Sequence, residues 1–262
     1  MKKGGIIFLI VLFQFETEAK ERIFIDTNSK KISEREAILI LPGFGSKVHG
    51  TKEVAEYFFN KQYDVFIPDY LSRNSIASCV ENMNEFYIKR NLKEYKKIHV
   101  FSYIVGSWTL NQWLQKYPEV KIHSIVYDRS PLQERAPYAL VKDIPFLIRI
   151  ISGKIMREFS ETPYSPIEKG ETKIGILIES EATKLVYKHK KSVFSLGEVD
   201  WEADSLNQKF DDVQYIWMNH DELYQNLNDF ANEIIHFFRE GEFSDSVRRT
   251  KYNEDPFKEF IK

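Results

Sequence analysis

The sequence predicts an α/β domain in which a mostly parallel central sheet is flanked by helices. Apolar runs of strand length recur along the chain, and two of them, 37–41 and 174–178, carry no polar side chain. Such runs are typical of strands buried on both faces of a sheet. Amphipathic stretches of helical length separate the runs, and parallel neighbours need crossover connections of that kind. The 262 residues leave room for one such domain.

The expected elements alternate from residue 21 onward. We predict strands at 22–26, 37–41, 63–67, 97–101, 123–127, 174–178 and 213–217, with the first at an edge of the sheet. We predict helices at 51–62, 76–95, 108–117 and 223–239, where apolar residues recur at helical spacing. Pro42 and Pro68 follow two of the strands directly and mark their ends.

The composition is that of an ordinary globular protein. The chain has 37 Lys and Arg against 39 Asp and Glu, and a net charge of −2 gives no attraction to nucleic acid. A single cysteine, Cys79, excludes an internal disulfide and a cysteine-based zinc site. The histidines show no paired spacing that indicates a metal. No glycine loop for a dinucleotide or a phosphate is present in the sequence, so we expect no cofactor.

Residues 1–19 have the layout of a secretory signal peptide or an N-terminal anchor. Lys2 and Lys3 precede an apolar run at 6–13, and the small residues Thr17 and Ala19 stand before a possible cleavage site. The run is short for a membrane span. We therefore expect export to the periplasm or the extracellular space, or attachment to a membrane through this segment if it is not cleaved.

Two other segments interrupt the alternation of strands and helices. Between Pro131 and Pro166, three prolines and an apolar stretch predict helices at the carboxyl edge of the sheet. They form either a cap or lid insertion or a packed part of the core. Residues 244–262 are mostly charged and predict a loosely attached C-terminal tail. The domain proper then spans residues 20–243.

Four short segments, in their order and spacing, resemble landmarks of the α/β-hydrolase fold of bacterial lipases and esterases. They are 41–46 (oxyanion loop, with Pro42 replacing the usual histidine), 102–107 (nucleophile elbow), 124–131 (a strand ending in Ser-Pro) and 219–224 (catalytic-histidine loop). The resemblance covers about residues 38–243. It implies the fold with a helical cap, and an ancestry among enzymes that cleave acyl esters.

The elbow lacks its expected nucleophile. The sharp turn of this fold demands small residues two positions before and two after the nucleophile. Ser102 and Gly106 meet that demand around Ile104, whose side chain has no atom that can attack a carbonyl. Centring the elbow on Ser102 would put bulky residues at the crowded positions, and centring it on Ser107 would move the turn into a helix.

The other parts of the site are assigned through the resemblance. His220, directly after an apolar strand, stands where the family has its catalytic base. Thr183 occupies the usual place of the acid, so Glu181 and Asp128 are the alternatives. The oxyanion loop and the cleft are expected to comprise Gly43, Phe44, Gly45, Tyr103 and Val105.

Two functions follow from this pattern. The first is an exported non-catalytic protein that binds an apolar small molecule or a protein partner in the cleft. The second is an active serine ester hydrolase that acts on an acyl ester with Ser102 or Ser107 and His220. Removing the serine of a serine hydrolase lowers turnover by about 10⁶. We therefore favour the first function.

Overall fold

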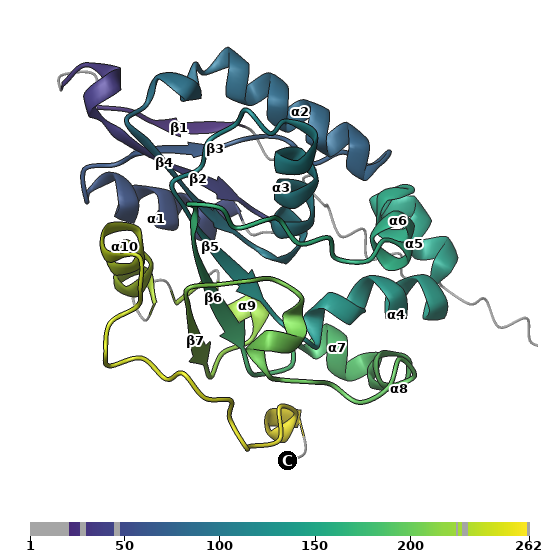
Figure 1. Ribbon diagram of the computed structural model, residues 1–262. Coiled ribbons are helices and arrows are strands. Elements are labelled where there is room, and N and C mark those ends of the chain that lie inside the picture. The colour runs from purple at the N-terminus through teal and green to yellow at the C-terminus, as the bar shows by residue number, and fades with distance from the viewer. Residues whose placement is uncertain (1–20, 27–29, 45–47, 224, 227–229, 261–262) are drawn as a thin grey trace, which may run out of the picture.

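Within the described residues, seven strands form one central sheet in the computed structural model (Figure 1). The structure describes residues 21–26, 30–44, 48–223, 225–226 and 230–260. The strands are β1 (Arg22–Phe24), β2 (Glu36–Leu41), β3 (Asp64–Ile67), β4 (Lys97–Ser102), β5 (Ser124–Arg129), β6 (Lys173–Glu179) and β7 (Asp212–Ile216). Their order is β1-β3-β2-β4-β5-β6-β7, and only β1, at one edge, runs antiparallel to its neighbour. The predicted fold class is confirmed.

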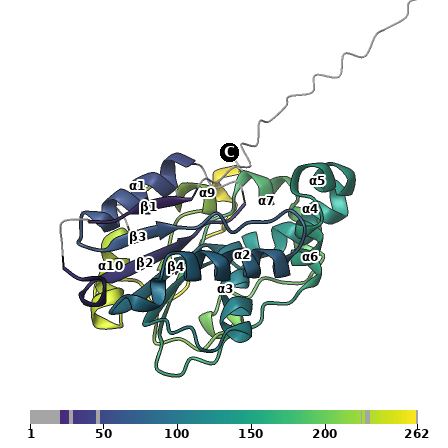
Figure 2. The same cartoon turned by 90° about the horizontal axis from the view of Figure 1, so that it is seen from above.

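Helices cover both faces of the sheet (Figures 1 and 2). They are α1 (Val48–Phe59), α2 (Ile76–Lys89), α3 (Ile104–Lys116), α4 (Ala136–Asp143), α5 (Pro145–Ser152), α6 (Ile155–Glu161), α7 (Lys184–Lys188), α8 (Lys190–Phe194), α9 (His220–Leu223) and α10 (Ala231–Glu240). Helix α3 begins four residues earlier than predicted, because Gly106 and Ser107 mask the start of its apolar spacing. The predicted helix at 223–239 is two helices, α9 and α10.

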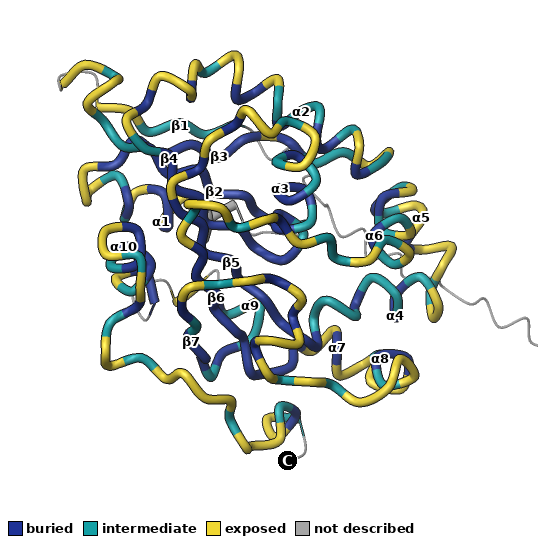
Figure 3. The backbone as a smooth tube through the Cα atoms, in the orientation of Figure 1, coloured by how far each residue is buried: buried dark blue, intermediate teal, exposed yellow. Residues whose placement is uncertain are grey.

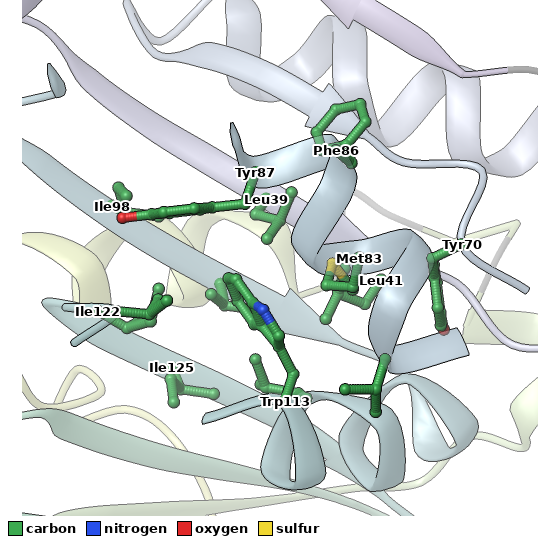
Figure 4. Close-up of a cluster of buried hydrophobic side chains, with 14 of the residues drawn as sticks. Leu39, Leu41, Tyr70, Met83, Phe86, Tyr87, Ile98, Trp113, Ile122 and Ile125 are labelled. Atoms are coloured by element: carbon green, nitrogen blue, oxygen red, sulfur yellow. The ribbon is translucent and has the colours of Figure 1, made fainter. Parts of the chain in front are cut away.

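The sheet separates two hydrophobic layers. Leu39 of β2 packs with Met83 of α2 and Trp113 of α3 on one face (Figure 4). Phe58 of α1 and Phe238 of α10 pack on the other face. Successive residues of a strand point to opposite faces, so the fully apolar strands supply both layers. Figure 3 shows the strands buried along most of their length.

Helices α4, α5 and α6 form the segment predicted as a cap. Ile155 and Phe159 of α6 are buried in the layer of α2 and α3, so this helix belongs to the core. The turn between α5 and α6 is held against the segment after β3, where the Arg73 carbonyl accepts a hydrogen bond of 2.9 Å from the Lys154 amide. Gly153 has a φ of 69°, and a Cβ there would lie 2.3 Å from the Arg73 oxygen. Glycine is therefore required at this contact.

The expectation of a loosely attached tail is wrong for residues 244–260. The Tyr215 amide of β7 donates to the Arg248 carbonyl at 2.8 Å, and the Ala182 amide donates to the Pro256 carbonyl at 3.0 Å. Phe257 is buried beside α7 and α8. The charges dominate the composition of this segment, but backbone pairing and the packing of Val247, Tyr252, Phe257 and Phe260 attach it to the domain.

The predicted signal peptide or anchor lies outside the described residues, as does Gly45. In the described part of the chain, none of the helices combines the length and the apolar composition that a membrane span requires.

Candidate active site

Four neighbouring strands bring the candidate residues to one edge of the sheet. The elbow follows β4, Asp128 lies near the end of β5, Glu179 ends β6, and His220 follows β7 as the first residue of α9. These strands are parallel and adjacent, so their carboxyl ends meet. Ligand sites of open α/β sheets lie at this edge.

The turn after β4 has the close contact expected of an elbow centred on Ile104. The Tyr103 amide donates to the Leu41 carbonyl at 3.0 Å, and Ile104 is the first residue of α3. A Cβ on Gly106 would lie 2.3 Å from the Leu41 oxygen. Only glycine fits there. This agrees with the assignment of Ile104 to the nucleophile position, two residues before Gly106.

The turn does not carry the backbone strain of a nucleophile elbow. In that motif the nucleophile sits on a sharp, strained turn between strand and helix. Among the described residues other than glycine, positive φ angles occur at Gln62, Asn91 and Asn207. Tyr103 is extended, with φ −76° and ψ 164°, and Ile104 continues directly into α3. Position 104 therefore carries neither a hydroxyl nor a strained backbone that would present one.

The two alternative serines are directed away from the histidine. Ser102 and Ser107 are fully buried, and their hydroxyl oxygens are 2.9 Å apart in a mutual hydrogen bond. Ser102 lies on the same face of β4 as Val100, which packs with α2 and α3. Within the described part of the chain, no hydrogen bond joins either hydroxyl to His220.

The imidazole of His220 lies against two buried carboxylates. Its Nδ1 is 2.7 Å from Oε1 of Glu179 and 3.4 Å from Oδ2 of Asp128. Asp128 points to the same face of the sheet as Val126, and Glu179 points to the same face as Leu177. Val126 and Leu177 belong to the hydrophobic layer of α1 and α10. The acids therefore lie on the sheet face opposite to the hydroxyl of Ser102.

The elbow residue that reaches His220 is Tyr103. The two rings meet edge to face at 80°, with 6.2 Å between their centroids. Tyr103 also packs against Phe101, with ring centroids 4.8 Å apart, and has no exposed surface. An aromatic ring and a hydrocarbon side chain thus occupy the turn where a serine hydrolase presents its hydroxyl.

The three charged groups determine one another's pKa values. Burial raises the pKa of Glu179 to about 8, and the adjacent Asp128 charge adds to the rise. Burial also raises the pKa of Asp128. At His220, burial opposes the charged form, but Glu179 and Asp128 outweigh it and hold the pKa well above its ordinary value. The protons in this cluster are therefore shared by three interacting groups, and the two acids favour the charged form of the imidazole.

Sequence reasoning missed Glu179. The sequence predicts a strand that ends at residue 178, and the resemblance places the acid at the position of Thr183, with Glu181 and Asp128 as the alternatives. Thr183 caps α7 by accepting a hydrogen bond from the Val186 amide at 3.2 Å, and Glu181 lies two residues past the end of β6. An acidic residue that ends a fully buried strand was the available signal. Asp128, the other candidate, is placed against His220.

The expected oxyanion loop is partly described. Gly43 is buried, and the Tyr70 hydroxyl donates to the Pro42 carbonyl. Phe44 packs against Phe159 of α6, with ring centroids 6.3 Å apart. Val105 is the second residue of α3, where amide groups have no partner within the helix. The loop and the helix start are therefore adjacent, as the motif requires.

Within the described residues, one group of side chains could hold a metal ion. It consists of Asp128, Glu179 and His220. Their ligand atoms lie within 4.8 Å of one another. The 2.7 Å contact between Nδ1 and Oε1 is a hydrogen-bond distance. Ligands about 2.1 Å from one tetrahedral ion lie more than 3 Å apart. The contact is therefore that of a shared proton.

Little surface at the elbow is open to a ligand. Tyr103 is fully buried and Ile104 is 6% exposed. A cavity of about 570 Å³ opens instead among α4, α5 and α6. Val141, Pro145 and Ile148 line it with apolar atoms. Its charged lining residues are three cations and two acids: Arg149, Lys154, Arg157, Glu158 and Glu161.

Comparison with solved structures agrees with this architecture: the chain has the α/β-hydrolase fold. It is similar to a structure reported with LipS and LipT, two metagenome-derived lipolytic enzymes. The TM-score is 0.53, the sequence identity is 11%, and the match covers 84% of this chain and 97% of the other chain. It is also similar to MGS-MChE2, an α/β-hydrolase enzyme from the sediment metagenome of the Mar Chica lagoon in Morocco (TM-score 0.51, 17% identity, coverage 84% and 98%). A third similar structure was reported with carboxylesterases of the thaumarchaeon Nitrososphaera gargenis (TM-score 0.51, 7% identity, coverage 85% and 94%). No family model and no curated protein matches the chain.

Proposed function

We propose that this α/β-hydrolase-fold protein binds an apolar ligand and does not hydrolyse esters. The observation that carries the proposal is Ile104 at the turn after β4, where Gly106 meets the Leu41 carbonyl and no oxygen is available to form an acyl-enzyme. Without the serine, about 10⁶ of the turnover of a serine hydrolase is lost. The similar lipases and esterases thus share the fold with this chain, and we do not extend their activity to it.

The state of His220 supports the same proposal. A general base must be neutral to accept a proton, and its pKa should lie near the working pH. Two carboxylates beside Nδ1 raise the pKa of His220 well above its ordinary value, although burial opposes the shift. The imidazole would therefore already hold both protons at neutral pH. Even a serine placed nearby would lack an acceptor for its proton.

The cavity among α4, α5 and α6 is the proposed binding site. Its volume of about 570 Å³ is within the usual range for small-molecule pockets. Val141, Pro145 and Ile148 suit an acyl chain. Of the two acids in the lining, Glu161 pairs with Arg157 and Glu158 accepts a hydrogen bond from the Ile76 amide. Arg149 and Lys154 are left to suit an acidic group at the end of the ligand. We propose a fatty acid or a related amphiphile as the ligand.

Hydrolysis is tested with p-nitrophenyl butyrate, p-nitrophenyl palmitate and a serine-directed fluorophosphonate. We expect no turnover above that of the His220→Gln variant and no covalent label. Labelling that disappears in Ser102→Ala or in Ser107→Ala would overturn the proposal and favour an active serine ester hydrolase.

Ligand binding is tested with a dansylated undecanoic acid. We expect saturable binding to the full chain, weakened in Ile148→Arg, because Ile148 lines the cavity with its apolar side chain. Val213→Arg, a partly buried position on β7 far along the sheet, is the matched control and should bind normally. Equal binding by the two variants would contradict the proposed site.

We also propose that the protein is exported through residues 1–19. The support is the sequence pattern of two lysines, an apolar run and small residues before Lys20. Mass measurement of the protein recovered outside the cytoplasm should give a chain that begins at Lys20 if the segment is cleaved. Recovery of all the protein from the cytoplasm would contradict export.

A further inference from the structure

We infer that helix α5 docks this protein onto an anionic lipid bilayer. The helix, Pro145–Ser152, exposes Phe146, Leu147 and Ile150 by 78%, 49% and 57%. Three large hydrophobic side chains thus reach solvent within five positions of the chain. This surface is separate from the acid–histidine cluster, and the inference holds whether or not the elbow supports hydrolysis.

The apolar face of α5 is presented by a firmly held helix. Ile148 and Ser152 form its buried side, and the Ser152 hydroxyl donates to the Ile148 carbonyl at 2.7 Å. The Arg73 guanidinium donates to the Ile150 carbonyl. Together with the Gly153 contact described above, these bonds fix the orientation of α5. Figure 3 shows exposed residues along this helix. The exposed face is therefore a feature of the packed fold.

Positive charge borders this face. The exposed cations of α4, α5, α6 and their connecting turns are Lys142, Arg149, Lys154 and Arg157. Three acids lie on the same elements, and all three have partners. Glu161 pairs with Arg157 at 2.7 Å, Asp143 is bonded to His189 and Ser192, and Glu158 accepts a hydrogen bond from the Ile76 amide. In the described part of the chain, Arg149 and Lys154 form no ion pair. A local excess of cations in a chain of net charge −2 is complementary to anionic head groups.

A bilayer fits this surface better than a second copy of the chain. Helices that lie in the membrane interface combine bulky apolar residues on one side with Lys and Arg on the other. A symmetric contact through α5 would bring Arg149 and Lys154 close to their own copies, and like charges oppose association. Three side chains also provide much less area than the roughly 800 Å² a side that a stable dimer buries.

Site-specific labelling tests the inference on the full chain. The one native cysteine, Cys79, is buried, and burial raises the pKa of its thiol to about 11, so it stays unlabelled. An NBD dye is attached at Phe146→Cys or, as the control, at Ile88→Cys near the far end of α2. Ile88 is 63% exposed, so both dyes start in water. Vesicles of phosphatidylcholine with phosphatidylglycerol, or of phosphatidylcholine alone, are then added.

We expect the dye at position 146 to brighten and shift to the blue with the anionic vesicles, and the dye at position 88 to stay unchanged. The N-terminal segment is the same in both labelled chains, so its own membrane affinity cannot produce the difference. No response at position 146, or an equal response at both positions, would overturn the inference.

Substitutions separate the apolar from the electrostatic contribution. In vesicle sedimentation, Phe146→Ser/Ile150→Ser should lower the partition coefficient by about tenfold or more, because two apolar side chains no longer enter the interface. Arg149→Gln/Lys154→Gln should lower it by about fivefold per charge, with anionic vesicles only. Ile88→Ser/Leu196→Ser, which removes exposed apolar side chains elsewhere, is the matched control.

One further result would overturn the inference in favour of a second copy of the chain. It is concentration-dependent dimerisation in analytical ultracentrifugation that disappears in Phe146→Ser/Ile150→Ser. Unchanged vesicle binding by that variant would likewise exclude α5 as the docking surface.

Discussion

Two histidines, a buried one and a partly buried one at opposite ends of the parallel strands, have pKa values shifted in opposite directions. His220, at the carboxyl edge, lies against Asp128 and Glu179, and its pKa is raised. His99 lies near the amino end of β4, and its pKa is lowered. Its Nδ1 is 2.7 Å from the Ser124 hydroxyl, and its Nε2 is 3.4 Å from Glu36.

The difference comes from how many acids face each ring and how deeply they are buried. Burial is the largest influence on the pKa of both histidines and disfavours the imidazolium. At His99, one partly exposed carboxylate, Glu36 at 3.4 Å, favours the imidazolium, but the effect of burial is larger and the pKa is lowered. At His220, two fully buried carboxylates favour the imidazolium, their combined effect exceeds that of burial, and the pKa is raised. A histidine beside an acid is therefore not by itself a catalytic pair.

The largest effect is expected when the His220 cation is removed. His220→Gln leaves two buried carboxyl groups with no positive partner, so the free energy of unfolding at pH 7 should fall by about 3 kcal/mol. The loss should be smaller at pH 5, where both carboxyl groups can be protonated. Urea unfolding at the two pH values measures this.

His189→Gln is the matched control for that measurement. His189 also contacts a carboxylate, Asp143, at 2.7 Å, but this pair is on the surface. Exposed ion pairs contribute little to stability, so this variant should unfold much like the unmodified chain. Equal losses in the two variants would show that the burial of the acids has no special role.

The next effect is the dependence of stability on pH. Folded Glu179 keeps its proton up to about pH 8, whereas an unfolded glutamate loses it near 4.5. Between these values the folded chain holds the extra proton, so its stability falls as pH rises. The raised pKa of His220 acts in the same direction, above its ordinary value of 6.5.

His99 acts in the opposite direction. Its folded pKa is lowered, so below 6.5 the unfolded chain takes up a proton first and stability falls as pH falls. Glu179→Gln should therefore reduce the loss of stability as pH rises from about 5 to about 8. His99→Gln should reduce only the loss of stability as pH falls below 6.5. Unfolding free energies from pH 5 to 9 test both expectations, and a His99→Gln effect on the alkaline side would contradict them.

A smaller effect is expected for the pKa of His220 when one acid is neutralised. Asp128→Asn removes one of the two negative charges, so this pKa should fall by about one to two units. NMR titration of the histidine Cε1 signals measures the shift. Asp211→Asn, which removes a carboxylate bound by Lys169 before β7, should leave the signal of His220 unchanged. An unchanged pKa in Asp128→Asn would mean that Glu179 alone holds the proton.

The sequence allowed the prediction of the strands more fully than that of the acid–histidine cluster. The apolar runs identified all seven strands, because strands buried on both faces leave a local pattern. The gathering of Asp128 and Glu179 around His220 depends on the register of three strands, which no local pattern specifies. The start of α3 was also missed. Its first turn is set by the contact of Gly106 with Leu41, a residue far away in the sequence.

The smallest effect is expected in catalysis. Ile104→Ser introduces a hydroxyl at the turn, but the imidazolium of His220 offers no acceptor for its proton, so we expect hydrolysis of p-nitrophenyl butyrate close to background. In Ile104→Ser/Asp128→Asn the lower pKa of His220 provides a neutral base while Glu179 still orients the ring at 2.7 Å. Turnover at pH 8 should then exceed that of the single variant by about 10²-fold, the lower end of what a positioned base contributes. Ile104→Ala/Asp128→Asn is the control that lacks the hydroxyl. If Ile104→Ser alone matched the double variant, His220 would already be neutral, and the contrast between the two histidines would reduce to their depth of burial.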